Sequence, residues 1–164
     1  QIDKIIKHNN LDIEIANDNS PLQVVISAKK KYLEDSEKFF LEAGAKKYVF
    51  LNVSAAFHSN LMLNSQIKMK THINNTFFEN SNISIISNFT GKICKNNKEI
   101  IENLSEQMSN RVRWVESIKT LEEKEEKNII EIGPGKVLTG LIKRISKNFN
   151  TTNIETITDL KNYS

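Results

Sequence analysis

Apolar and polar residues alternate near the N-terminus, which is the period of a β-strand. In residues 11–15 every second side chain is apolar, and a second apolar run follows at 24–26. Between them, residues 17–21 concentrate Asn, Asp, Ser and Pro, which favour turns because they hydrogen-bond locally or fix the backbone. The pattern predicts a β-hairpin.

Helical periodicity is found on both sides of this hairpin. The isoleucines in residues 2–6 have helical spacing and predict the last turns of a helix. Residues 29–43 place their apolar side chains on one helix face, and Gly44 is the expected C-cap. A strand is predicted next, over residues 48–53. The order helix, strand, strand, helix, strand is that of a ferredoxin-like βαββαβ unit without its first strand.

The rest of the chain has the pattern of an α/β protein. Helices and one β-rich run are expected in its middle part, in the order helix 61–78, β-rich run 83–93, helix 98–108 and helix 112–124. A short apolar strand at 128–132 is followed at once by the turn Gly133-Pro134-Gly135 and a helix over 137–145. Strand, glycine turn and helix in succession are typical of α/β folds. A last strand is predicted at 154–157.

Size, charge and hydropathy exclude several classes of protein. A chain of 164 residues, 38% of them hydrophobic, can bury roughly 70% of its unfolded surface. The net charge of +3 is too small to indicate a nucleic-acid partner. No run of roughly 18 apolar residues predicts a membrane span. The chain begins with Gln1 in what reads as the middle of a helix, so we expect it to be a piece of a longer one.

His58 is the candidate catalytic residue. It follows the predicted strand 48–53, and active sites of α/β proteins gather at strand ends. Imidazole has an unperturbed pKa of about 6.5 and therefore suits proton transfer at neutral pH. The alternative is a hydrogen-bonded structural histidine. His8 and His72 lie in polar helical contexts and are expected to have no catalytic role.

No nucleophile or metal site accompanies His58 in the sequence. The chain lacks a G-x-S-x-G elbow, and Cys94 has only Lys92 and Lys95 as basic neighbours, so we expect an ordinary packed thiol. A single cysteine excludes an internal disulfide and fits a cytoplasmic protein. No H-x-x-x-H or H-E-x-x-H pattern indicates a metal. The segment Gly133-Pro134-Gly135-Lys136 departs from phosphate-loop spacing and predicts a tight turn before a helix.

Four motifs in the chain resemble the malonyl-CoA:acyl-carrier-protein transacylase family and occur in the family's order. They are NSPLQVVIS at 19–27, AAFHSNLM at 55–62, RWVESI at 113–118 and EIGPGKVL at 131–138. The resemblance extends over nearly the whole chain and corresponds to the family's C-terminal half. It implies an incomplete ferredoxin-like subdomain at residues 1–54, and the C-terminal part of an α/β-hydrolase-like acyltransferase domain at residues 55–164.

The resemblance also implies an activity in fatty-acid synthesis and the residues that serve it. In this family a serine takes malonyl from CoA and passes it to the phosphopantetheine thiol of acyl carrier protein, with no cofactor beyond these substrates. His58 matches the general base, and Gln107 matches the residue whose main-chain carbonyl orients that base. Phe57 matches a position where a bulky aromatic favours malonyl over methylmalonyl units.

The resemblance also shows what this chain lacks. The elbow serine, the oxyanion-hole Gln and the Arg that pairs with the malonyl carboxylate belong to the family's N-terminal half. The isolated chain is therefore expected to be inactive. The alternative from another class is a non-catalytic module that binds acidic carrier protein through a basic helix, with Lys136, Lys143, Arg144 and Lys147. Neither nucleic acid nor a membrane is an expected partner.

Overall fold

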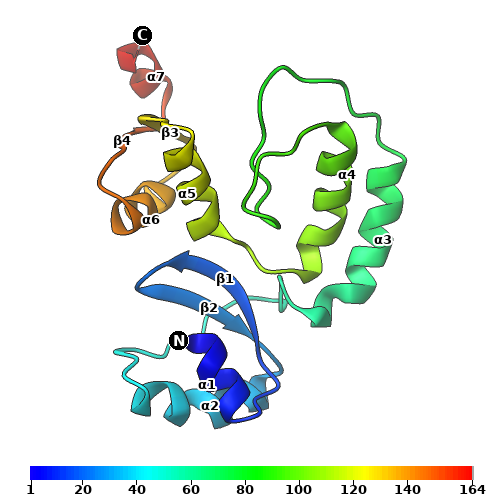
Figure 1. The fold of residues 1–164 in the computed structure, drawn as a ribbon, viewed down its shortest axis with the longest axis vertical. Helices are drawn as coiled ribbons and strands as arrows, with labels where there is room; N and C mark the ends of the chain where they lie inside the picture. Colours follow the sequence, from blue (N-terminus) through cyan, green and yellow to red (C-terminus); the bar gives the residue numbers. More distant parts are fainter. Residues whose placement is uncertain (164) are drawn as a thin grey trace.

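The first third of the chain is built on the predicted hairpin. The computed structural model describes residues 1–163. Strand β1 (Glu14–Ser20) pairs antiparallel with β2 (Gln23–Ser27), which confirms the hairpin. Helices α1 (Ile2–His8) and α2 (Lys30–Glu42) contact each other and lie at one end of it (Figure 1).

The hairpin turn is shorter than the predicted 17–21. The strand pairing continues through Ser20, so only the two residues after it form the turn. The polar residues before Ser20 stay in the strand because a second segment also binds their backbone. The Val112 amide donates to the Ala16 carbonyl (2.8 Å), and the Asp18 amide donates to the Val112 carbonyl (3.0 Å).

The strand predicted over 48–53 is wrong. Within the described residues no strand lies beside this segment to complete a hydrogen-bond ladder, so it runs as an irregular chain. It is anchored at Tyr48, whose hydroxyl donates to the Leu33 carbonyl (2.9 Å) and lies 3.1 Å from Ser36 Oγ. The side chains that follow have exposed fractions of 48–68%: Val49, Phe50, Leu51 and Val53. The ferredoxin-like arrangement is not confirmed.

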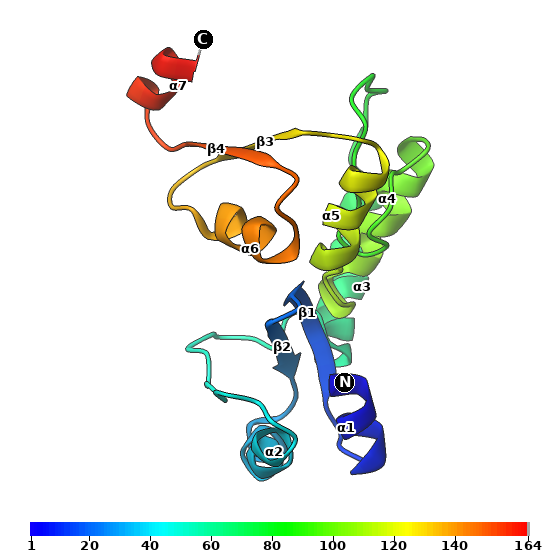
Figure 2. The ribbon, with the colours of Figure 1, turned by 60° about the vertical axis from the view of Figure 1, so that its left-hand side comes forward.

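A helical excursion forms the middle of the chain. The short 3-10 helix η1 (Asn60–Met62) leads into α3 (Leu63–Asn74), so the predicted helix 61–78 ends earlier than expected. Helix α4 (Asn97–Glu106) runs back beside α3 and continues into the 3-10 helix η2 (Gln107–Ser109) (Figures 1 and 2).

The β-rich run predicted over 83–93 has a single isolated bridge, between Ile86 and Ile93, in the described residues. A tight turn joins its two arms, in which the Gly91 amide donates to the Ser87 carbonyl (2.7 Å). The pairing does not extend beyond this bridge into a β-ladder, since the residues on either side of Ile86 and Ile93 are irregular.

The last part of the chain forms the predicted α/β unit. Helix α5 (Trp114–Glu123) precedes β3 (Asn128–Ile132), and α6 (Val137–Ile145) connects β3 to its parallel neighbour β4 (Asn150–Ile154). The strand predicted at 154–157 is misplaced, because the in-register partner of β3 lies earlier in the chain.

A cluster of buried apolar side chains lies within this unit. Ile118, Ile142 and Phe149 are buried and pack together. Further apolar side chains pack against them: Trp114, Leu121, Ile129 and Ile145. The fold is therefore mixed α/β, as predicted. In the part of the chain that the structure describes, no helix is long and apolar enough to cross a membrane.

Helix α7 (Ile157–Tyr163) ends the described chain and begins at a capping box. Asp159 Oδ2 accepts hydrogen bonds from the Thr156 hydroxyl (2.8 Å), the Thr156 amide (2.8 Å) and the Glu155 amide (3.1 Å). These bonds, the Thr156 hydroxyl first, hold the pKa of the Asp159 carboxyl below its ordinary value of 3.8.

Candidate active site

The backbone of His58 is held in an unusual conformation at the start of the helical excursion. Its φ is +63°, in the left-handed region that few residues other than glycine adopt. The His58 amide donates to the Met108 carbonyl at 2.9 Å. The next residue, Ser59, is fully buried, and its hydroxyl donates to the Ala56 carbonyl at 2.7 Å. These contacts compensate for the strain and fix the direction of the His58 side chain.

The His58 ring meets the main chain of η2. Its Nδ1 lies 3.0 Å from the Gln107 carbonyl oxygen, across a sequence separation of 49. A carbonyl oxygen only accepts hydrogen bonds, so Nδ1 carries the proton in this contact. In the neutral ring Nε2 then has a free lone pair and can accept a proton. The structure thus brings His58 together with Gln107. The contact is made by the backbone oxygen of Gln107 and not by its side chain.

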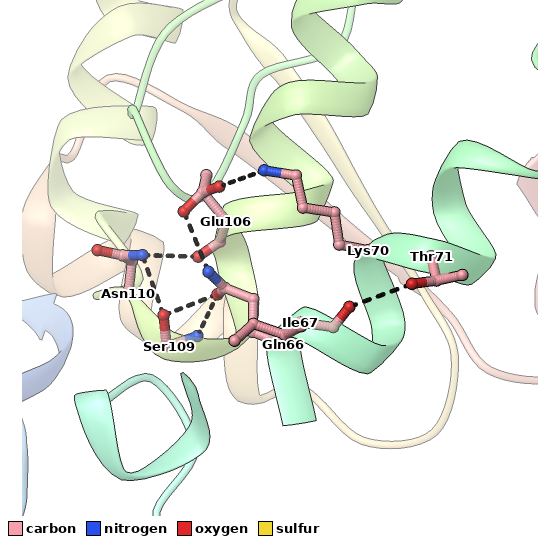
Figure 3. A network of polar contacts seen from close by, with 7 residues as sticks. All are labelled: Gln66, Ile67, Lys70, Thr71, Glu106, Ser109 and Asn110. Carbon is pink, nitrogen blue, oxygen red and sulfur yellow. Dashed lines mark hydrogen bonds and ion pairs between the residues drawn. The ribbon is translucent and has the colours of Figure 1, made fainter. Parts of the chain in front are cut away.

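A side chain of α3 holds η2 in place (Figure 3). Gln66 is 5% exposed, and its Oε1 accepts hydrogen bonds from the Ser109 amide (2.8 Å) and the Ser109 hydroxyl (2.7 Å). Gln66 Nε2 donates to Glu106 Oε2 at 3.0 Å, while Lys70 Nζ lies 3.2 Å from Glu106 Oε1. The turn that carries the Gln107 carbonyl is therefore tied to α3 by a polar network.

Asn110 ties the same turn from its C-terminal side. Its Nδ2 donates to the Glu106 carbonyl at 2.8 Å, and the Gln107 side-chain amide donates to the Asn110 carbonyl at 3.1 Å. Helix η2 is consequently braced at both ends, although it spans only Gln107–Ser109.

Phe57 lies next to the candidate base. Its ring centroid is 6.5 Å from that of His58, and its side chain is 49% exposed. The two rings are tilted by 51° to each other, so Phe57 and His58 lie side by side with the Phe57 ring half exposed.

The glycine turn after β3 does not form an open anion site. Gly133 and Gly135 adopt positive φ angles of +134° and +82°, as a tight turn requires. Two backbone amides in the first turn of α6, which have no partner within the helix, donate instead to the Glu131 carboxylate. The distances are 2.9 Å from the Leu138 amide and 2.8 Å from the Thr139 amide.

Cys94 is partly buried, and its sulfur accepts a hydrogen bond from the Asn103 side chain at 3.3 Å. Among residues 1–163 there is no group of three or more His, Cys, Asp or Glu side chains that could hold a metal ion.

Sequence reasoning missed the residues that support the site. Gln66 and Ser109 are polar residues inside helical segments, and Met108 contributes only its backbone. A buried glutamine has no sequence signature that separates it from an exposed one. The one available signal is that Gln66 lies on the first turns of the helix that directly follows His58.

Comparison with known proteins gives close relatives. No protein-family model matches the chain. The malonyl CoA-acyl carrier protein transacylase of Bacillus subtilis (strain 168) is 37% identical over 149 residues, which are 91% of this chain and 47% of the relative. The crystal structure of the transacylase of Synechocystis sp. PCC 6803 has a TM-score of 0.88 at 33% identity and covers 99% of this chain and 55% of its own. The structure of a type II PKS acyl-carrier protein in complex with its malonyl-transacylase (PlMCAT:AntF) has a TM-score of 0.91 at 31% identity. The match covers 98% of this chain and 52% of the other.

These similarities show that the chain is a homologue of acyltransferases over nearly all of its length. The family is that of the malonyl-CoA:acyl-carrier-protein transacylases, which confirms the resemblance found in the four sequence motifs. The chain spans about half the length of the relatives that it matches.

Proposed function

We propose that this chain is the C-terminal half of a malonyl-CoA:acyl-carrier-protein transacylase, and that His58 is the general base of the malonyl transfer. The observation that carries the proposal is the 3.0 Å contact between His58 Nδ1 and the Gln107 carbonyl oxygen. It leaves Nε2 as the proton acceptor, in a chain homologous to transacylases. In this proposal residues 1–54 belong to a ferredoxin-like subdomain and residues 55–164 to the acyltransferase domain.

The reaction has two proton-balanced halves. His58 Nε2 takes the proton of a serine hydroxyl while the serine oxygen bonds to the malonyl carbonyl carbon. The carbon–sulfur bond to CoA then breaks, and the leaving thiolate receives the proton from His58. In the second half Nε2 takes the proton of the phosphopantetheine thiol while its sulfur bonds to the malonyl carbonyl carbon. The carbon–oxygen bond to the serine then breaks, and the serine oxygen receives the proton from His58. The Gln107 carbonyl stabilises the imidazolium that exists between these steps.

The serine must come from outside this chain, because the family resemblance places it in the N-terminal half. We therefore expect the isolated chain to transfer no malonyl. A chimaera that joins the N-terminal half of the Bacillus subtilis transacylase to this chain supplies the missing serine. We expect the chimaera to transfer malonyl from CoA to carrier protein, as measured by the mass of the loaded carrier.

The substitution His58→Asn tests the base in that chimaera. Asn tolerates the left-handed backbone at this position but cannot accept the proton, so the substitution removes chemistry with little strain. Loss of a general base slows transfer by roughly 10²–10⁴-fold. The matched control is His72→Asn, because His72 is exposed on α3. Near-normal turnover of the His58 variant would remove His58 from the proposed role.

A second candidate function is a non-catalytic module that binds carrier protein. The observation that favours it is the set of exposed basic side chains in and around α6: Lys136, Lys143, Arg144 and Lys147. Titration of the isolated chain with carrier protein at low and high salt tests this candidate. Binding that weakens steeply with salt supports it, since exposed charges are screened, and salt-independent or undetectable binding rejects it.

A further inference from the structure

We propose that Gln66 is the positioning residue of this site, because it holds η2 so that the Gln107 carbonyl faces His58 Nδ1. This inference rests on the proposed role of His58 as the base. Gln66 touches no reacting atom. It acts on the base through the backbone of η2.

The geometry links Gln66 to the base through two neighbouring peptide groups. Gln66 Oε1 binds both donors of Ser109, its amide at 2.8 Å and its hydroxyl at 2.7 Å (Figure 3). The two residues before Ser109 supply both carbonyls that hold His58. The Met108 carbonyl accepts from the His58 amide at 2.9 Å, and the Gln107 carbonyl lies 3.0 Å from Nδ1.

Burial makes this tie hard to replace. Gln66 is 5% exposed and Ser109 is 4% exposed, so water is not a ready substitute acceptor for the Ser109 amide. Without Gln66 the amide must turn toward another carbonyl. The carbonyl three residues earlier, the usual 3-10 acceptor, is that of Glu106, which already accepts from Asn110 Nδ2 at 2.8 Å. A turn of the Ser109 amide carries the Met108 carbonyl with it, because both belong to one planar peptide group. The Gln107 carbonyl belongs to the next peptide group, which is joined through Met108 Cα, so it loses its fixed direction when that neighbour turns.

The other end of Gln66 fixes which way its amide group faces. Its Nε2 donates to Glu106 Oε2 at 3.0 Å, and the opposite oxygen of that carboxylate is held by Lys70 at 3.2 Å. A carboxylate accepts only, so the amide nitrogen faces Glu106 and the amide oxygen faces Ser109. Lys70 and Glu106 thereby set the orientation of the Gln66 acceptor.

The consequence for the base is a preference between two tautomers. With the Gln107 carbonyl in place, the neutral His58 ring carries its proton on Nδ1. When the carbonyl turns away, this constraint is lost and the proton moves toward Nε2, which blocks the nitrogen that must accept the serine proton. Long-range ¹H–¹⁵N NMR of the ¹⁵N-histidine-labelled chain above neutral pH reports the tautomer directly. The exposed His8 and His72 in the same spectrum are internal references.

The test compares the wild-type chain with Gln66→Met, which keeps the volume and removes both hydrogen-bonding groups. We expect Nδ1–H to predominate in the wild type and its fraction to fall at least twofold in the variant. The matched control is Thr120→Val, which removes the partly buried 2.6 Å hydrogen bond from the Thr120 hydroxyl to the Gly91 carbonyl. This bond shares no residue with the network around η2. This control is expected to leave the His58 tautomer unchanged.

A charge-conserving exchange provides the rescue. Gln66→Glu alone places two carboxylates within 3.0 Å of each other and removes the donor. Adding Glu106→Gln restores a donor and an acceptor in reversed order. We expect the single variant to lose the Nδ1–H tautomer and the double variant to recover it. A loss of packing alone would not be repaired by this exchange, so the rescue separates positioning from general stability.

Each outcome has a separate meaning. An unchanged tautomer in a folded Gln66→Met chain overturns the role of Gln66 and leaves that of His58 intact. If Gln66→Met does not fold, the exchange decides, and a double variant without recovery overturns the proposal. An Nε2–H tautomer in the wild-type chain would refute the His58–Gln107 contact and, with it, both proposals.

Discussion

A close approach between a loop and α5 predicts that Gly91→Ala strongly destabilises the chain. Gly91 has a φ of +68°, and a Cβ added there would lie 2.6 Å from Glu116 Cβ on α5. Left-handed backbone costs an alanine roughly 1–2 kcal/mol. Overpacking against a helix adds roughly 1–3 kcal/mol. We therefore expect the free energy of unfolding to fall by about 2–5 kcal/mol, a large part of the 5–15 kcal/mol typical of folded domains.

Two other glycines serve as matched controls, because each isolates one part of this effect. Gly44 has a φ of +95° with nothing within 4 Å of an added Cβ, so Gly44→Ala brings backbone strain alone, about 1–2 kcal/mol. Gly140 lies inside α6, and an added Cβ there also meets open space. Gly140→Ala is expected to stabilise the chain by about 0.5–1 kcal/mol, since alanine loses less conformational freedom in a helix.

Urea unfolding, followed by the fluorescence of the single tryptophan, Trp114, measures all three variants. The midpoint should rise for Gly140→Ala and fall modestly for Gly44→Ala. For Gly91→Ala the midpoint should fall most, while the slope of the unfolding free energy against urea concentration stays unchanged. A Gly91→Ala chain as stable as Gly44→Ala would show that the contact with Glu116 relaxes freely, and it would refute the steric part of the reasoning.

Two shorter predictions concern substrate choice and pH. In the active chimaera, Phe57→Ala should raise the kcat/KM for methylmalonyl relative to that for malonyl by roughly 10–200-fold at most. The limit follows because excluding one methyl group is worth only about 1–3 kcal/mol. An unchanged ratio of the two kcat/KM values would contradict a role for this ring. The lowered pKa of Asp159 means that its contribution to α7 is complete above the ordinary value of 3.8 and is lost as the pH falls through the lowered pKa. Hydrogen-exchange protection of the Leu160 amide should therefore drop in acid, and Asp159→Ala should abolish that pH dependence; a wild-type protection that stays flat would count against it.

Elements whose evidence is local could be predicted from the sequence. The hairpin of β1 and β2 follows from alternation on either side of turn formers. The succession of β3, glycine turn and α6 follows from an apolar run, two glycines and a helical period. In each case the residues that carry the pattern also make the stabilising contacts, so the segment alone contains the information.

Elements that depend on a distant partner could not be predicted. The run 48–53 has the composition of a strand, but a strand needs a neighbour, and the described chain places none beside it. The polar residues 17–20 look like a turn and are strand because Val112 binds their backbone from far along the chain. The same limit applies to the site. Resemblance pointed to His58 and Gln107, whereas the tie from Gln66 is visible only once α3 and η2 are seen in contact.

The meeting of His58 with Gln107 and Met108 has a consequence for insertion tolerance. These contacts lie at the base of the α3–α4 excursion, whose two ends meet there, while its exposed tip at residues 79–84 is farthest along the chain from both ends (Figure 1). Each doubling of a flexible loop costs only about 0.6 kcal/mol in closure entropy. Residues can therefore be inserted or deleted at the tip without moving the imidazole. By the same reasoning, one residue added between α4 and Ser109 would shift both carbonyls away from it.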